Sequence, residues 1–259
     1  MLRTFVVVLS LIPDLAGAVE PAPLPRGACQ APVPGHDLRH CEFTALDRPG
    51  IDLRGSNLEG VIFEKARLAR CDLRGASLRG TNLKWADLSA CDLSGADLTG
   101  AELFHVNFED AVLAGALLRE ANLFGSYLNR IDAHGADFTA AFLKDVSIEE
   151  ANLVGCQFDR SYMLRAVLIG SRLNDARAHQ AVLTGAALEH VDFRGADLTG
   201  SLLNGASLEG TRWQGARISG TRFTNASVRG ADFAGVLDMP EHLRAMLPGA
   251  LPASGPAPN

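Results

Sequence analysis

The sequence predicts an all-β solenoid, in which the chain winds repeatedly around one apolar interior. Three observations predict it. A large apolar residue recurs at every fifth position, a small residue stands two positions before each of them, and no insertion or deletion breaks this frame between Ile51 and Phe233. Strict self-similarity at a fixed period is the signature of a repeat architecture.

The large apolar positions run from Leu53 to Phe233. Of these 37 positions, only Ala133 and Ala178 are not Leu, Phe, Ile, Val, Met or Trp. The positions two residues earlier are all Ala, Ser, Thr, Cys, Val or Ile. Asp or Asn often follows the small residue and Gly often closes the unit, as in the pentad ADLTG at residues 96–100.

A period of five fits neither common element. Five residues advance an α-helix by ~500°, so the large residues would spiral around every side of it. On a flat strand, an odd period would send successive large residues to opposite faces. A chain that turns a corner every five residues instead keeps each of them inside, with the small residue at the crowded corner and the charged positions outside.

The repeated unit A-(D/N)-L-x-x resembles the pentapeptide repeat family over residues 36–237. The resemblance implies a right-handed quadrilateral β-helix with four pentads, or 20 residues, per coil. Stacked coils would lie ~4.8 Å apart, and the 37 pentads would form about nine coils. Arg48 departs from the pattern at an inward position beside Pro49 and Gly50, and predicts an irregular solenoid before Ile51.

The segments outside the repeat have separate assignments. Residues 1–18 have the features of a secretory signal peptide, with Arg3, an apolar run over residues 5–12 and a small-residue cleavage pattern ending at Ala18. This predicts a periplasmic or secreted protein. Residues 19–35 are expected to be a Pro-rich linker. Residues 238–247 predict a capping helix with Asp238 as its N-cap, and residues 248–259 a disordered tail.

The five cysteines fall into two groups. Cys29 and Cys41 flank the start of the regular region, and the sequence leaves open whether they form a disulfide or remain free thiols. Together with His36 and His40 they do not match a usual zinc spacing, so no metal site is predicted. The other three, Cys71, Cys91 and Cys156, stand at small inward positions and are expected to be core residues.

A coil of 20 residues also predicts which outward side chains are neighbours. Arg172, Asp192 and Arg212 would form a column of alternating charge, as would Arg177, Asp197 and Arg217. The column with Asp52, Asp72 and Asp92 has one sign, and Arg54 and Arg74 would neutralise it.

The same stacking places several apolar side chains at outward positions on one face. We expect these residues to form an apolar stripe that serves as an interface with a second copy or a protein partner, because a monomer seldom exposes a large apolar patch without a use for it. The alternative is that each ring lies flat over neighbouring glycines and contributes only local packing. The stripe residues are Phe104, Phe124, Phe142, Tyr162, Leu164, Val182 and Leu202.

Composition and motifs limit the function classes. The net charge of −6 argues against a polybasic nucleic-acid binder, and the chain has no recognisable nucleophile, phosphate-binding, dinucleotide or zinc motif. The expected protein is therefore a non-enzymatic binding or scaffold protein without a cofactor. The alternative comes from the resemblance alone, since some family members mimic duplex DNA and bind DNA gyrase. The mixture of acidic residues 85–118 with Arg212, Arg217, Arg222 and Arg229 suits such a mimic poorly.

Overall fold

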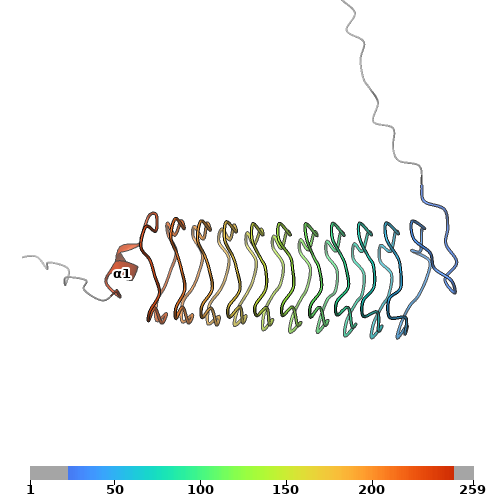
Figure 1. The fold of residues 1–259 in the computed structure, drawn as a ribbon, viewed down its shortest axis with the longest axis horizontal. Helices are drawn as coiled ribbons and strands as arrows, with labels where there is room; N and C mark the ends of the chain where they lie inside the picture. Colours follow the sequence, from blue (N-terminus) through green and yellow to red (C-terminus); the bar gives the residue numbers. More distant parts are fainter. Residues whose placement is uncertain (1–22, 248–259) are drawn as a thin grey trace, which may run out of the picture.

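The chain forms a straight, four-sided rod of stacked coils (Figure 1). The structure is a computed structural model and describes residues 23–247. Residues twenty apart form parallel β-bridges without interruption, from Asp37–Asn57 to Arg217–Leu237. The ladder therefore covers 200 residues, or ten coils of 20. The sequence-based count of about nine was low because it began at Ile51, whereas the regular coils begin at Asp37.

Each pentad makes one side of the square. In the pentad that ends at Gly55, the Leu53 amide donates to the Asp72 carbonyl of the next coil at 2.8 Å, and the Gly55 amide donates to Arg74 at 2.9 Å. The Ser56 amide donates back to the Leu53 carbonyl at 3.1 Å and closes the turn. The fifth residue has a left-handed backbone, with φ +61° at Gly55. This conformation explains why glycine so often ends the unit.

The interior is filled as the period predicts. Leu98, Leu118 and Leu198 are at most 1% exposed, and the small residues two positions earlier are also buried. At most polar small positions the hydroxyl donates to a backbone carbonyl, whereas that of Ser161 is buried without a hydrogen-bond partner. Ser171 donates to the Ile148 carbonyl at 2.7 Å and accepts from the Ala151 amide at 2.9 Å. The backbone can therefore pair with a Ser or Thr hydroxyl at the corner, as it does at Ser171.

Two departures from the repeat are accommodated in different ways. The prediction that Arg48 disrupts the solenoid is wrong, because the ladder continues through Asp47–Arg67. Arg48 stands in the first coil, whose outer side has no further coil stacked on it, so its side chain reaches solvent and donates to the Gln30 carbonyl at 3.4 Å. Ala178, deep in the rod, instead leaves an apolar space of about 10 Å³ lined by Leu173, Phe193 and other core residues.

The N-terminal end is covered by residues 23–35. Arg26 forms a bridge with Asp37, and the Gly27 amide donates to the Asp37 carbonyl at 3.0 Å. A disulfide between Cys29 and Cys41 ties this segment to the first coil, which resolves the alternative that the sequence left open. The predicted Pro-rich linker is therefore, over these residues, a cap attached to the rod, and Leu38 beneath it is fully buried.

The inward cysteines are buried, as expected, but two of them are joined. Cys71 and Cys91 occupy the same corner in consecutive coils, so their Cα atoms are 4.6 Å apart and the structure links them as a second disulfide. Cys156 is the remaining cysteine, and burial raises the pKa of its thiol to about 12. Its Sγ donates to the Ala133 carbonyl at 2.9 Å. A thiol in this state is unreactive at neutral pH.

The C-terminal end is covered by a short helix, α1 (Glu241–Arg244) (Figure 1). It is shorter than the predicted helix over residues 238–247, and its N-cap is Pro240 instead of Asp238, which adopts a left-handed turn with φ +55°. Leu243 is fully buried against the last coil. The predicted signal peptide, residues 1–18, and the predicted tail, residues 248–259, lie outside the described residues. Within residues 23–247, no helix has the length and apolarity needed to cross a membrane.

Outward charges pair along and between the coils. Arg54 lies 2.7 Å from Asp52 and 3.3 Å from Asp72, which confirms that arginines neutralise this acidic column. Asp192 is bridged on either side by Arg172 and Arg212, but its closest ion pair, at 2.6 Å, is with Arg194 two residues along the same coil. The column alternates in charge as predicted, whereas the strongest contact comes from within the pentad.

This contact predicts a loss of stability in acid. Burial disfavours the Asp192 carboxylate, but hydrogen bonds from the Arg194 side chain and backbone outweigh it and lower the pKa of Asp192 to about 2. The ordinary pKa of aspartate is about 3.9. The stabilisation is therefore complete above pH ~4 and is lost as the pH falls through about 2. We expect Asp192→Asn to lower the melting temperature at pH 7 and to make it less dependent on pH between 4 and 2. An unchanged acid slope would contradict this assignment.

Candidate protein-binding stripe

The apolar side chains predicted to form a stripe lie on one side of the rod. Phe142, Tyr162, Val182 and Leu202 occupy successive rungs of one ladder, joined by the bridges Phe142–Tyr162, Tyr162–Val182 and Val182–Leu202. Phe104, Phe124 and Leu164 stand at the adjacent corner, two residues further along their pentads. All seven are at least partly exposed, and Phe142 is 38% exposed.

The rings of the stripe are stacked on one another. Centroids of Phe104 and Phe124 lie 5.2 Å apart with planes at 10°, and those of Phe142 and Tyr162 lie 5.3 Å apart with planes at 6°. Phe124 and Phe142 join the two pairs at 6.3 Å and 15°. Since their faces contact each other, these rings present mainly their edges to solvent. The alternative in which each ring lies flat over glycines does not describe this group.

Two further apolar residues extend this face. Trp85 is 48% exposed and packs edge-on against Phe104 with centroids 5.4 Å apart. Sequence reasoning missed it because it occupies the left-handed fifth position, one place beyond the corner position of Phe104. Ile62 is 39% exposed and shares the ladder column of Phe142, so the 20-residue spacing alone would have found it, but Asn82, Glu102 and Asn122 separate the two.

We name the five consecutive rings Trp85, Phe104, Phe124, Phe142 and Tyr162 the aromatic row. One ring comes from each of five neighbouring coils, so the row runs obliquely from the corner onto the flat side.

Polar groups fix the rings of the row from its sides. The Lys65 ammonium lies 5.7 Å from the centre of the Trp85 ring, and that of Lys144 lies 5.5 Å from the centre of Phe124. The His105 ring packs edge-on against Phe104 at 4.2 Å, and its Nδ1 lies 2.9 Å from the Gly125 carbonyl oxygen. Gly125 is required here, because a Cβ would come within 2.4 Å of this imidazole. The row is thus a fixed feature of the rod.

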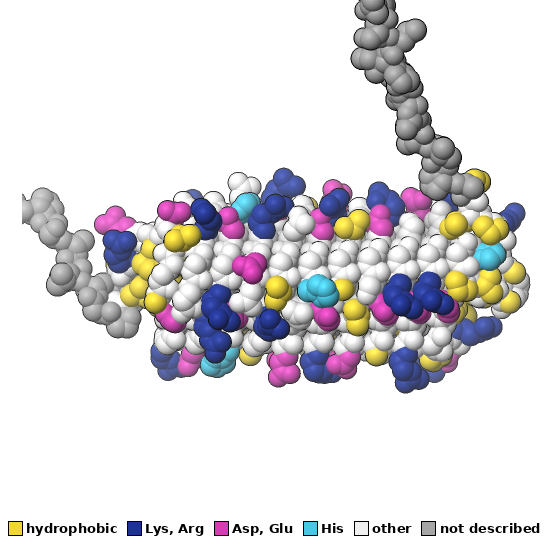
Figure 2. Space-filling model, turned by 45° about the horizontal axis from the view of Figure 1, so that its top comes forward, with side chains coloured by type: hydrophobic (Ala, Val, Ile, Leu, Met, Phe, Trp, Pro, Cys, Tyr) yellow, Lys and Arg dark blue, Asp and Glu magenta, His cyan; other side chains and the backbone are white. Residues whose placement is uncertain are grey.

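The rest of the surface has charges of both signs. In the view of Figure 2, basic and acidic side chains are interspersed along the rod, with smaller apolar groups between them. The contacts agree with this view, since Arg130 pairs with Asp110 at 2.7 Å and Arg165 pairs with Asp145 at 2.7 Å, each across one coil spacing. These paired residues do not form the dense array of unpaired negative charge that a mimic of duplex DNA needs.

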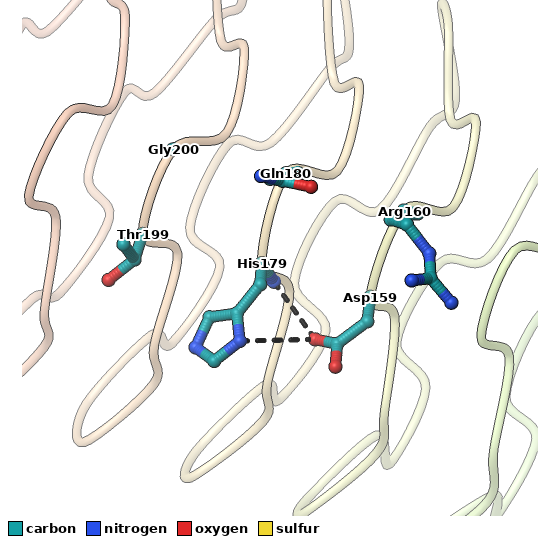
Figure 3. A pocket seen from close by; sticks show the side chains of 6 residues that line it. All are labelled: Asp159, Arg160, His179, Gln180, Thr199 and Gly200. Atoms are coloured by element: carbon teal, nitrogen blue, oxygen red, sulfur yellow. Dashed lines mark hydrogen bonds and ion pairs between the residues drawn. The ribbon is translucent and has the colours of Figure 1, made fainter.

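One shallow hollow, of about 380 Å³, lies elsewhere on the rod around His179 (Figure 3). The His179 Nε2 atom lies 3.0 Å from an Asp197 carboxylate oxygen, and its backbone amide donates to Asp159 at 3.1 Å. Arg177 also pairs with Asp159, at 2.8 Å. Figure 3 shows Gln180, Thr199 and Gly200 around the same hollow but no Ser, Cys or Lys nucleophile. The arrangement is a network of ion pairs that joins three coils.

The other histidines and the N-terminal cysteines offer no better constellation. His134 pairs with Asp132 at 2.8 Å on the exposed surface, and His190 lies against Gly210 of the next coil. In the described part of the chain, one group of three donor residues, Cys29, His40 and Cys41, has its ligand atoms within 4.8 Å of one another. Both sulfur atoms are held in the disulfide, so they do not offer the thiolates that a metal would need.

Comparison with known families agrees with this architecture. A family model described as "Pentapeptide repeats" matches in eight copies that together cover residues 50–237. The chain belongs to the pentapeptide repeat family. The right-handed quadrilateral β-helix implied by the resemblance is therefore its fold.

Solved structures of other pentapeptide repeat proteins resemble this one. HetL, a protein involved in heterocyst differentiation regulation in the cyanobacterium Nostoc, is 26% identical, with a TM-score of 0.54 over 77% of this chain and 91% of its own. QnrB1, a plasmid-mediated fluoroquinolone resistance protein, is 21% identical, with a TM-score of 0.41 over 79% of this chain and 95% of its own. No curated protein sequence matched the chain.

Proposed function

We propose that this pentapeptide repeat protein is a non-enzymatic binding or scaffold protein of the cell envelope or the secreted space, and that the apolar stripe is its protein-binding surface. The observation that carries the proposal is the aromatic row. Aromatic residues are enriched at protein interfaces and supply much of the binding energy there. A stacked row on a rigid rod presents them in fixed positions, so little conformational entropy is lost on binding.

The polar features of the surface support a binding role over catalysis. His105 contacts a backbone carbonyl and His179 a carboxylate, and the hydroxyl of Thr199 in the lining of the hollow donates to Asp197 at 2.6 Å instead of to the imidazole. The regular frame also leaves no inserted loop between Asp37 and Leu237 from which a deep cleft could be built. The extracytoplasmic location rests on the signal-peptide pattern of residues 1–18.

Site-specific photo-cross-linking in the producing cells tests the binding role. A photoreactive amino acid at Tyr162 is expected to give a discrete protein adduct. The matched control is Val112, which occupies the same pentad position on the opposite side of the rod and is also half-buried; here we expect no adduct. Equal adducts at both positions, or none at Tyr162, would contradict the proposal.

Fractionation of the same cells tests the location. We expect the protein in the extracytoplasmic fraction, beginning at Val19. A cytoplasmic chain that retains Met1 would contradict the envelope assignment and would favour the gyrase-binding alternative.

A further inference from the structure

We infer that Cys29, His40 and Cys41 form a metal-binding site when their disulfide is reduced, and that the site takes Zn²⁺ or another thiophilic d¹⁰ ion. The disulfide and the ion are then alternative ties that hold the N-terminal cap, residues 23–35, on the first coil. The three donor groups lie at the N-terminal end of the rod and outside the apolar stripe, so this site is independent of the proposed binding surface.

The three donor atoms are already close together. The ligand atoms of Cys29, His40 and Cys41 lie within 4.8 Å of one another, and the Cys41 Sγ atom is 3.7 Å from the His40 Nε2 atom. In a tetrahedral site with Zn–S bonds of ~2.3 Å and Zn–N bonds of ~2.0 Å, a sulfur and a nitrogen ligand are about 3.6 Å apart. The two sulfurs must separate to about 3.8 Å once their bond is broken, and rotation of the half-buried Cys29 side chain can provide this separation.

The turn at His40 departs from the repeat. From Gly35 to Gly235, the fifth residue of every pentad except His40 has a left-handed backbone. The fifth residue ordinarily donates its amide to the next coil, as Gly60 does to the Arg79 carbonyl at 2.9 Å. Among the described residues, His40 lacks both the left-handed turn and this bond. The departure therefore gives up a coil-to-coil hydrogen bond at the one pentad where the imidazole lies beside a cysteine sulfur.

The fourth coordination position of the site is open to solvent. The exposed His40 lines a hollow of about 470 Å³ together with Arg26, Asp37 and Arg39. Asp37 is held by Arg39 at 2.7 Å, so water is the available fourth ligand. Three protein ligands and one water form a common coordination set for Zn²⁺. Two thiolates neutralise a divalent ion, so the nearby Arg26 does not repel the occupied site.

Of the two disulfides, the one at this site is accessible to a reductant. Cys29 is half-buried, whereas Cys71 and Cys91 are at most 1% exposed inside the rod. A dithiol attacks the exposed sulfur, supplies two electrons and two protons, and leaves as its own disulfide while Cys29 and Cys41 become thiols. A divalent ion then replaces the two thiol protons, and the neutral His40 imidazole donates its Nε2 lone pair. The newly made chain has the same two thiols before the disulfide forms.

The cap needs such a tie because its other polar contacts with the first coil are few. Over residues 23–32, the Gly27 amide donates to the Asp37 carbonyl at 3.0 Å and the Asp37 amide donates to the Pro25 carbonyl at 2.8 Å. The third contact is the Arg48 side chain, which reaches the Gln30 carbonyl at 3.4 Å. Gly27 lies directly over Leu38, which is fully buried beneath it. Without a disulfide or an ion, these contacts alone keep Leu38 covered.

Metal binding by the purified mature protein tests the site. After reduction by a dithiol and removal of the dithiol without oxygen, we expect one Zn²⁺ to bind per chain in competition with a chromophoric chelator. Co²⁺ should give the absorption of thiolate-to-metal charge transfer, and the oxidised chain should bind neither ion. His40→Ala is expected to weaken Zn²⁺ binding at least tenfold, since even groups that only support a ligand contribute that much. His36→Ala is the matched control, because the His36 Nδ1 atom contacts the Pro34 carbonyl at 2.8 Å, and it should leave the affinity unchanged. A reduced chain that binds no Zn²⁺, or that binds it equally well after Cys29→Ser, would overturn the inference.

Hydrogen exchange tests whether the ion ties the cap to the rod. Peptides that contain the Gly27 and Asp37 amides should exchange slowly in the disulfide form and in the reduced form with Zn²⁺, and faster in the reduced form without metal. Cys29→Ser should exchange fast in all three conditions, and peptides around Leu118 in the middle of the rod should not change. Equally fast exchange of the reduced cap with and without Zn²⁺ would show that the ion is not a tie. Neither experiment involves Tyr162, so the binding role of the stripe is decided separately by its own cross-linking test.

Discussion

Replacing Trp213 with alanine is expected to destabilise the C-terminal coils by about 3–5 kcal/mol, the usual cost of removing a large buried aromatic side chain. Trp213 is fully buried and stacks between Phe193 at 4.4 Å and Phe233 at 5.2 Å. Its indole Nε1 donates to the Thr211 hydroxyl at 2.8 Å. The variant therefore loses ring contacts on both sides, as well as a hydrogen bond next to the last coils under α1.

The loss should be confined to the C-terminal end of the rod. In a solenoid each coil contacts only its neighbours, so a defect near one end frays that end first. Hydrogen exchange measured by mass spectrometry should show faster exchange from about Phe193 to Leu247 and unchanged exchange before Phe138. Trp85→Ala is the matched control, because Trp85 is 48% exposed and should contribute little to stability. Uniformly faster exchange along the whole chain would contradict this nearest-neighbour description.

The architecture could be predicted from the sequence because one constraint repeats in every pentad. Each inward leucine occupies a site like the next one, so the interior positions follow from the frame alone. The 20-residue stacking also brought Phe142 and Tyr162 together correctly, with centroids 5.3 Å apart. These results depend only on the periodicity and on burying apolar side chains.

The features that were missed are those in which a residue departs from its place in the frame. Trp85 reaches Phe104 from a turn position that usually holds glycine, and the direction of a large side chain at a left-handed residue does not follow from spacing. Arg48 is tolerated because it lies in the first coil, and periodicity does not show where a rod ends. The Cys71–Cys91 disulfide was missed for another reason. Both residues were assigned to the core because they stand at small inward positions, and the 20-residue stacking that makes them neighbours was not applied to them.

Leu118→Asn is expected to be the most damaging single substitution in the middle of the rod, with a cost of about 4–5 kcal/mol. Leu118 is fully buried, so the change removes an apolar side chain and buries an amide without partners. The fifth of the ten coils contains this residue, so the defect interrupts the contact between the two halves. Because cooperativity in a solenoid passes from coil to coil, we expect the single unfolding transition to separate into two in urea.

The neighbouring residue provides the control for this prediction. Leu117 has the same side chain but points outward and is half-buried, in a ladder column between Asp97 and Asp137. Leu117→Asn places at this site a residue that is common in this position of the pentad, and surface changes of this kind usually alter stability by less than about 0.5 kcal/mol. The two variants have the same composition and differ only in which side of the coil receives the amide. If both destabilised the rod to a similar extent, the inward and outward positions of the pentad would have been assigned wrongly, and with them the outward positions on which the aromatic row depends.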